Sequence, residues 1–165
     1  MALPTPAALR DRPLHLHTER LNWQHIASLR DTLCSADITE CTLMGLTPEQ
    51  ALATALVTTN DQAFAACLED GAPVGAFGWT PQGAIWSLWV PLSPGIAREV
   101  LLRTPWWVAF MVASSGLKHL CNFVHTKNTR TIKWLKASRC FDLDSYISKT
   151  ASGDYFYFQT KEPEG

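Results

Sequence analysis

The sequence predicts a mixed α/β (α+β) fold with a mostly antiparallel, twisted central sheet of six to seven strands and helices on both faces. The chain has 165 residues, which suits one domain. Hydrophobic residues make up 47% of it, and seven Trp and seven Phe supply apolar area for an ordinary core. Segments with strand and helix periodicity follow one another in the order β α α β β β α β α β β. We expect an extended arm at residues 1–13, one domain at residues 14–160 and a tail at residues 161–165.

Three segments near the N-terminus carry clear local signals. Leu14–Thr18 alternates between apolar and polar residues and predicts the first strand. From Trp23 to Leu33 the apolar residues have a helical period, and a polar segment with Asp37 and Glu40 follows. Thr47–Gln50 predicts the start of a second helix, because Thr can cap it, Pro suits its first position and Gln completes a capping box.

The middle of the chain predicts a three-stranded antiparallel meander. Short turns containing Gly71 and Gly83 separate its strands, since glycine tolerates the positive φ that such turns need. Trp86 and Trp89 lie in the third strand, where we expect them to pack in the core or in an interface. The strands are expected at residues 62–68, 74–79 and 84–90.

The last third of the chain predicts two helices and three strands. Ser93-Pro94 can begin a helix, and Pro105 should kink it or start a new one, because proline lacks an N–H and its ring meets the preceding turn. Gly116 is the expected C-cap. The remaining elements are a strand at residues 119–124, a helix at 129–137 and a closing antiparallel pair at 141–148 and 155–159.

Cysteine and histidine form no metal motif in the sequence. The five cysteines are widely spread and include no CxxC pair, so we expect free thiols in a reducing compartment. His15 and His17 share one face of the first strand, but no third ligand follows at a motif spacing. The sequence therefore predicts no metal site.

Charge is unevenly distributed along a chain whose net charge is −1. Residues 1–97 hold four basic and nine acidic residues, and residues 98–139 hold eight basic residues and one acidic residue. The basic 98–139 segment suits a surface for DNA phosphates or an acidic partner, or else a solvated helix face that balances the acidic segments. The nearly neutral whole argues against a dedicated DNA-binding protein.

Neither a membrane span nor a secretory signal is apparent. The most apolar stretch, residues 105–113, is far shorter than the roughly 20 residues that a membrane helix needs. The N-terminus lacks a charged segment followed by an apolar run. We expect a soluble protein.

The segment from His119 to Lys136 resembles a known fold family. His119–His125 is followed by Asn128 and then by Thr131–Lys136. This is similar to the pattern of the GCN5-related N-acetyltransferases (GNATs), in which an Asn follows the fifth strand and begins a helix that usually carries a Tyr. The expected order of elements is also theirs. The resemblance implies a GNAT-like fold over essentially the whole chain.

A narrower resemblance is to the internal virion protein A family of short-tailed bacteriophages. It lies in Asn122-x-Val124-x-x-x-Asn128-x-x-x-Ile132-x-Trp134-Leu135-Lys136 and in the ending Tyr155–Gln159. This resemblance implies a role in assembling the virion interior or the apparatus that delivers phage DNA. The implied location is the virion or the host cytoplasm.

The stretch that would bind the cofactor departs from the GNAT pattern. The resemblance implies that acetyl-CoA pyrophosphate meets free N–H groups where the third meander strand enters its helix, on a turn written Arg or Gln, two residues, Gly, one residue, Gly or Ala. In Val90–Ala97 no Arg or Gln stands at the start and Gly95 is the one glycine. Pro91 and Pro94 each remove an amide donor where the phosphates need one.

The catalytic groups that the resemblance implies are also not found in the sequence. A Glu on the central strands commonly acts as the base, but residues 74–90 contain no Asp, Glu or His, and only Ser87 or Thr80 could hold a water there. The Tyr that protonates the leaving thiolate would fall on Trp134, Leu135 or Lys136.

We therefore expect a non-catalytic phage protein of GNAT-like fold, with no catalytic residue and no cofactor. Its partners would be other virion proteins and, through the basic 98–139 segment, DNA. The alternative is an atypical acyl-CoA-dependent N-acyltransferase, acting on a host component, in which Ser93, Gly95 and Asn128 would bind acetyl-CoA. The basic residues expected to form the interaction surface are Arg130, Lys133, Lys136 and Arg139.

Overall fold

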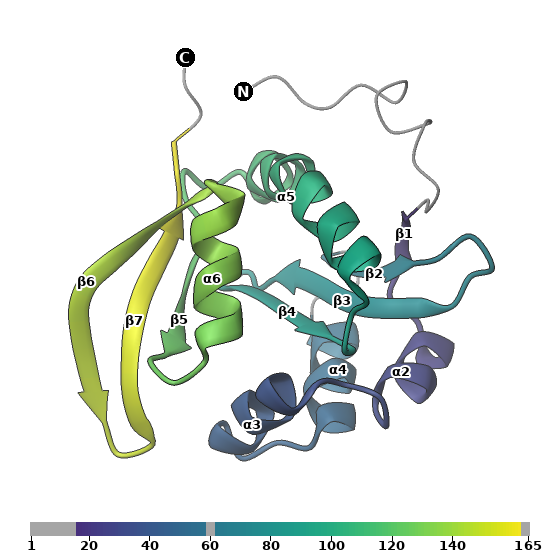
Figure 1. The fold of residues 1–165 in the computed structure, drawn as a ribbon, viewed down its shortest axis with the longest axis horizontal. Coiled ribbons are helices and arrows are strands. Elements are labelled where there is room, and N and C mark those ends of the chain that lie inside the picture. Colours follow the sequence, from purple (N-terminus) through teal and green to yellow (C-terminus); the bar gives the residue numbers. More distant parts are fainter. Residues whose placement is uncertain (1–15, 59–61, 163–165) are drawn as a thin grey trace.

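The computed structural model describes residues 16–58 and 62–162 of the chain. Seven strands and five helices lie in these ranges, in the arrangement of Figure 1. The expected arm at residues 1–13 lies outside the described residues, as do His15 and part of the expected tail. In chain order the elements are β1 (His17–Arg20), α2 (Trp23–Leu29), α3 (Ser35–Leu43), α4 (Pro48–Thr58), β2 (Ala63–Cys67), β3 (Pro73–Trp79), β4 (Ile85–Trp89), α5 (Pro94–Ser115), β5 (Cys121–His125), α6 (Thr129–Ser138), β6 (Phe141–Thr150) and β7 (Gly153–Thr160).

The predicted fold class is confirmed, with a mostly antiparallel sheet structure and helices on both faces. The strands form a four-stranded sheet in the order β1-β2-β3-β4 and a three-stranded sheet in the order β5-β7-β6. All neighbours within both sheets are antiparallel. Helices α2, α3 and α4 lie on one face of the larger sheet and α5 on the other (Figure 1).

The two sheets meet at one point, between β4 and β5. There Ala84 and Cys121 form an isolated parallel bridge, in which the Cys121 N–H donates to the Gly83 C=O at 2.9 Å. Beyond this bridge the two strands diverge (Figure 1). A gap between the carboxyl ends of β4 and β5 follows from this divergence.

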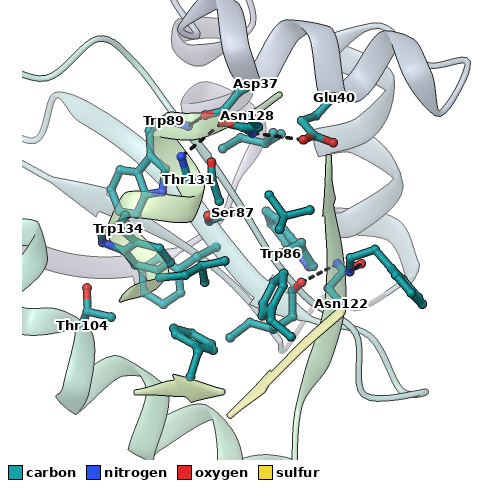
Figure 2. Close-up of a pocket in the computed structure, with 18 of the residues that line it drawn as sticks. Asp37, Glu40, Trp86, Ser87, Trp89, Thr104, Asn122, Asn128, Thr131 and Trp134 are labelled. Atoms are coloured by element: carbon teal, nitrogen blue, oxygen red, sulfur yellow. Dashed lines mark hydrogen bonds between the residues drawn. The ribbon is translucent and has the colours of Figure 1, made fainter. Parts of the chain in front are cut away.

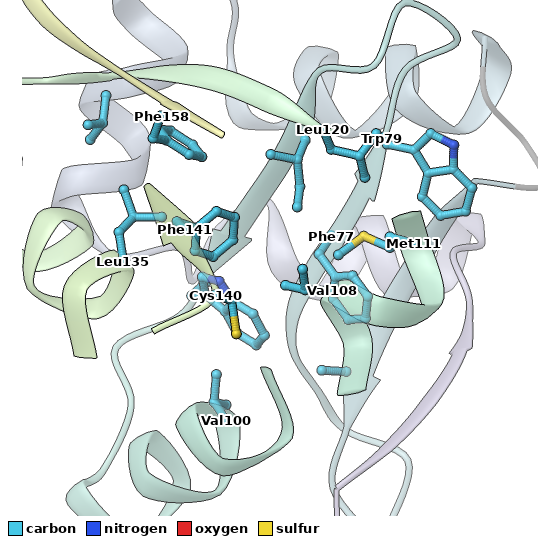
Figure 3. Packing of buried hydrophobic residues seen from close by; sticks show 14 of the residues in the cluster. Phe77, Trp79, Val100, Val108, Met111, Leu120, Leu135, Cys140, Phe141 and Phe158 are labelled. Carbon is cyan, nitrogen blue, oxygen red and sulfur yellow. The ribbon is translucent and has the colours of Figure 1, made fainter. Parts of the chain in front are cut away.

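Two clusters of buried side chains stabilise the fold, one on each face of the larger sheet. On the α5 face, Val100, Val108 and Met111 of α5 pack toward Phe77 of β3, and Phe141 extends the cluster beneath α6 (Figure 3). The other cluster is smaller and joins the α2, α3 and α4 helices to alanine-rich β2. Burial of this apolar surface is the main driving force for the fold.

The tryptophans of β4 pack as expected from their position in a central strand. Trp89 is buried and stacks with Phe77 and Trp107, at ring-centroid distances of 6.4 and 6.1 Å. Trp86 is half-buried and lies near the other cluster. The prediction of a packing role for Trp89 is therefore confirmed.

The structure corrects the sequence prediction at α3. The segment with Asp37 and Glu40, which the sequence marked only as polar and to which no helix was assigned, is a helix of nine residues. Its N-cap, Cys34, makes no side-chain capping bond, and only Asp37 and Cys41 of the helix are buried. A helix with so small an apolar face and no capping signal has no recognisable pattern in the sequence.

Two helix boundaries also differ from the prediction. The helix expected to reach Leu33 ends at Leu29, where the Thr32 hydroxyl donates to the Ser28 C=O at 2.9 Å and takes over a helical acceptor. Pro105 does not begin a new helix, because α5 is continuous through it. Immediately before the proline, the Thr104 hydroxyl donates to the Val100 C=O at 2.7 Å.

Candidate functional site between β4 and β5

Alternate residues of β4 turn their backbone polar groups toward the gap. The Val90 N–H donates to the Val74 C=O of the neighbouring strand at 3.0 Å. Bonded and non-bonded pairs alternate along an antiparallel ladder, so Ile85, Ser87 and Trp89 direct their N–H and C=O groups away from β3. These three residues form the edge of β4 that faces β5.

Both ends of this edge are already hydrogen-bonded to other parts of the chain. The Trp89 N–H donates to the Asp37 carboxylate at 2.7 Å, and the Trp89 C=O accepts from the Cys34 N–H at 2.8 Å. At the other end of the strand, the Asn122 side chain donates to the Ile85 C=O at 2.6 Å (Figure 2). Within the described residues, the Ser87 N–H and C=O have no partner on this edge.

Helix α3 also spans the gap to α6. The Asn128 side chain caps α6 by accepting from the Thr131 N–H at 3.2 Å, and it donates to the Glu40 carboxylate at 3.0 Å (Figure 2). The Arg130 guanidinium lies 3.9 Å from the Asp37 carboxylate and donates to the Cys34 sulfur. Helix α3 and its N-cap therefore contact both the carboxyl end of β4 and the start of α6.

The Asp37 carboxyl group is the least solvated ionisable group at this site. Its residue is 5% exposed, and burial raises its pKa above the usual range. The Trp89 N–H and the Arg130 charge oppose that shift because both stabilise the carboxylate. Burial also raises the pKa of the neighbouring Cys34 thiol, so this cysteine is no activated nucleophile.

A cavity of about 160 Å³ lies in the gap. Its walls are mainly apolar and come from β4, β5, α5 and α6, with Asp37 and Glu40 contributing from α3. Ser87 and Trp134 also line it, and the buried indole N–H of Trp134 has no hydrogen-bond partner among the described residues. A cavity of this size accommodates a group about as large as benzene, such as a short acyl chain.

The start of α5 offers few free donors for a phosphate. The Ser93 hydroxyl already accepts from the Ile96 N–H at 3.4 Å, and Pro94 occupies the first turn of the helix. Gly95 and Ala97 match the last part of the acetyltransferase turn, Gly-x-Ala, but Leu92 stands where the pattern has Arg or Gln. The start of α5 thus keeps the last part of the turn's sequence pattern but has fewer N–H donors.

The structure places the four predicted interaction residues along α6 and at its C-terminal end. Lys133 and Lys136 are exposed on α6. Arg139 is exposed as well, but it is the C-cap of the helix with φ 59°, beyond the last helical residue as its spacing suggested. Arg130 contacts α3, as described above. Of the residues of the alternative prediction, Asn128 lies at the cavity, whereas Ser93 and Gly95 lie at the start of α5.

The acidic residues of the site could not be found by inspecting β3 and β4 for a base. Asp37 and Glu40 come from α3, which lies far from β4 in the sequence. The sequence signal for them is that two acidic residues stand three positions apart, which places both on one face if the segment is helical. Without evidence for a helix there, that signal was uninformative.

A four-stranded sheet that separates from a second sheet at β4 and β5, with a helix following β4, is the arrangement of the GNAT class of folds. The solved structures that this chain resembles are of that class. The aminoglycoside acetyltransferase AAC(6')-Ib, in complex with ribostamycin and coenzyme A, matches with a TM-score of 0.64 and 15% identity, over 88% of this chain and 92% of its own.

Two further structures support the same fold. A GNAT-family acetyltransferase from Bacillus anthracis matches with a TM-score of 0.63 and 13% identity, over 87% of this chain and 93% of its own. Ard1 from Thermoplasma volcanium matches with a TM-score of 0.63 and 11% identity, over 90% and 99%. No protein-family model and no curated protein matches the sequence. At such low identity the likeness shows the GNAT fold and nothing finer.

In the described part of the chain, no helix has the length and apolarity needed to cross a membrane. The longest, α5, carries Arg98, Glu99 and Arg103 in its first half.

Proposed function

We propose that this protein uses the acetyltransferase fold as a framework for binding other macromolecules and does not transfer acyl groups. The observation that carries the proposal is the occupied edge of β4. Asp37 and Cys34 bind both backbone groups of Trp89, at the end of the strand nearest the helix that would receive the phosphates. A ligand that reaches the gap from that helix has to displace them.

The chemistry of coenzyme A explains why this edge matters. Its pantetheine arm contains two amide groups, and an extended amide chain binds a protein most readily by pairing with an exposed strand edge. Its diphosphate needs several N–H donors or cations at a helix start. Here Asp37 and Cys34 bind the Trp89 end of the edge, and Pro91 and Pro94 reduce the donors at the helix start.

The role that we propose for the framework is assembly of the interior or DNA-delivery apparatus of a short-tailed phage particle. The resemblance of residues 122–136 to the internal virion protein A family supports it. Lys133 and Lys136 of α6 and Arg139 at its C-cap are exposed cations, available to an acidic protein partner or to DNA phosphates. Such a role requires a stable folded surface and no cofactor.

A second candidate function, N-acyl transfer from an acyl-CoA, is favoured by the cavity and by Trp134. The unpartnered indole N–H of Trp134 could donate to the carbonyl or sulfur of a thioester in the cavity. An indole does not give up its proton at neutral pH, so it could orient a thioester but not protonate the leaving thiolate. Asp37, with its raised pKa, would be the candidate base once released from Trp89.

Calorimetric titration with acetyl-CoA separates the two functions. For the framework we expect no saturable binding up to about 1 mM acetyl-CoA, equivalent to less than about 4 kcal/mol of binding free energy. Micromolar binding that weakens at least tenfold in Trp134→Phe would contradict the framework and support the acyltransferase. Lys136→Ala is the matched control, because this exposed side chain lies on the same helix and does not line the cavity.

The virion role predicts that the protein is present in purified particles of the phage that encodes it. Quantitative mass spectrometry of gradient-purified particles should detect it at a fixed copy number per particle. Triple substitution of Lys133, Lys136 and Arg139 by Glu should reduce that number severalfold, because it reverses all three charges. Particles without the protein would rule out a role as a virion component.

A further inference from the structure

A second group of chemically active side chains lies on the α2 face of the larger sheet, away from the gap. In the β1–β2 ladder His17 is the direct partner of Cys67, so their side chains leave the sheet on the same face. Glu19 follows two residues later on β1 and therefore shares that face. One ligand atom from each of the three lies within 4.8 Å of the other two.

The metal-free arrangement already brings the three groups into contact. The His17 Nε2 lies 2.8 Å from a Glu19 carboxylate oxygen. The Cys67 thiol hydrogen-bonds Glu19 and contributes to a lowered pKa of that carboxyl, after the larger effect of His17. His17 and Glu19 have side chains 47% and 42% exposed, whereas Cys67 is fully buried. Cys67 thus forms the buried side of the cluster, and His17 and Glu19 form its solvent-accessible side.

His25 of α2 completes the surroundings of the cluster. Its Nδ1 accepts from the Asn22 N–H at 3.2 Å in the capping box of α2, so its proton is on Nε2. The Nε2 lies 3.8 Å from the Cys67 sulfur and 3.7 Å from Glu19. With its lone pair directed to the cap, His25 cannot ligate a metal through Nε2. It can donate that N–H to an anionic ligand.

We propose that His17, Glu19 and Cys67 bind a divalent transition-metal ion, with Zn²⁺ as the chemically preferred occupant. Imidazole nitrogen, thiolate sulfur and carboxylate oxygen are the three ligand types that zinc takes, and such three-ligand sites leave a fourth position for water. Metal–ligand bonds of about 2.0–2.3 Å require donor atoms about 3.3–3.8 Å apart. Side-chain rotation of the exposed His17 and Glu19 supplies the small approach that this needs.

Charge and protonation are balanced in this site. The Cys67 thiol loses its proton to solvent when the metal–sulfur bond forms, and the thiolate and the Glu19 carboxylate together neutralise a 2+ ion. In the metal-free protein, burial first and Glu19 second raise the pKa of Cys67 to about 12, so a competing metal has to displace the proton. The His25 N–H then stabilises the new thiolate, as an outer hydrogen bond commonly does at metal sites.

The arrangement differs from an ordinary surface ion pair in one respect. An exposed His17–Glu19 ion pair does not require a cysteine beside it, and exposed ion pairs contribute little to stability. Cys67 is placed opposite His17 by the strand register and has a nitrogen of His25 aimed near its sulfur. Metal binding would join edge strand β1 to β2 and so hold the first strand of the sheet in place.

Titration of the full chain with Co²⁺ tests this proposal, because a thiolate ligand gives a near-ultraviolet charge-transfer band that nitrogen and oxygen ligands do not. We expect a 1:1 complex with this band, displaced by Zn²⁺, and a rise in the thermal midpoint on adding Zn²⁺. Cys67→Ala should abolish the band, and His17→Ala and Glu19→Gln should each weaken Co²⁺ binding at least tenfold. His17 and Glu19 are partly exposed, so we expect both variants to fold, and an unchanged far-ultraviolet circular dichroism spectrum would show that lost binding is not lost folding.

Cys121→Ala is the matched control, since Cys121 is a partly exposed free thiol on the other sheet. It should bind Co²⁺ like the unmodified protein. The proposal is overturned if the unmodified protein shows no charge-transfer band, or if Cys67→Ala keeps the band and its affinity. Loss of the band in Cys121→Ala with retention in Cys67→Ala would place the metal elsewhere and also overturn it.

Discussion

Replacing Asp37 with alanine is expected to lower the free energy of unfolding by roughly 2–3 kcal/mol, because a hydrogen bond to a charged group is lost and its donor stays buried. The Trp89 N–H has the Asp37 carboxylate as its partner at 2.7 Å, and Asp37 is 5% exposed. Arg130 loses its nearby opposite charge at the same time. Urea unfolding followed by tryptophan fluorescence measures the effect.

Two variants separate the lost hydrogen bond from other causes. Asp37→Asn keeps an oxygen that can accept from Trp89 and should retain a large part of the stability. Asp31→Ala removes a carboxylate that is 81% exposed and should change stability by less than about 0.5 kcal/mol. An Asp37→Ala protein as stable as the unmodified one would show that the α3 contact contributes nothing to closing the β4 edge.

The same residue has a pH signature. Its pKa is raised in the folded protein, so the folded state holds the proton to a higher pH than the unfolded chain does. The stability that Asp37 contributes through this shift is therefore fully present below the ordinary carboxyl pKa and is lost as pH rises through the pKa of Asp37 in the folded protein. The difference in stability between the unmodified protein and Asp37→Asn should shift against the unmodified protein over that interval.

Gly75→Ala is the second substitution with a large expected effect. A Cβ at Gly75 would lie 2.0 Å from Cε3 of the Trp89 ring, far inside van der Waals contact. Trp89 has little freedom to move, because it is buried and stacked on Phe77 and Trp107. Overpacking of this kind costs about 1–3 kcal/mol or more, and we expect the upper part of that range. The thermal midpoint and urea unfolding would both report it.

A double-mutant cycle shows whether the ring causes the effect. In a Trp89→Leu background the added methyl group meets a smaller side chain, so Gly75→Ala should cost clearly less than in the unmodified protein. Gly71→Ala is the backbone control: its φ is +89°, but nothing lies within 4 Å of the added Cβ. Equal costs for Gly75→Ala in both backgrounds would refute the steric explanation.

Much of the fold was predictable because the decisive signals are local. The reciprocal bonds between Thr47 and Gln50 at the start of α4 were expected from four residues, and both are present at 2.9 and 3.1 Å. Gly71, Gly83 and Gly116 take the positive φ that their turns and cap suggested. Turn chemistry depends on neighbours in the sequence, so a sequence pattern contains it.

The candidate site was much less predictable, for the opposite reason. The role of Asp37 depends on its hydrogen bond with Trp89, 52 residues away, and that of Asn128 on its hydrogen bond with Glu40, 88 residues away. Likewise His17 is separated by 50 positions from Cys67, its partner in the ladder. No periodicity encodes such pairs, because they depend on how the strands and helices come together. The loss of donors at Pro91 and Pro94 was visible in the sequence because proline acts where it stands.

Because Asp37 and Cys34 bind the Trp89 backbone, any ligand that needs the same N–H and C=O groups has to compete with residues of the chain itself. A group on the same chain acts at an effective concentration of at least about millimolar when its tether permits the contact. Asp37 and Cys34 belong to a packed helix start, so they return to Trp89 after every transient separation. A free thioester at a concentration far below that effective value would seldom displace them, whereas a partner protein that docks on the outside of α6 would not need to displace them.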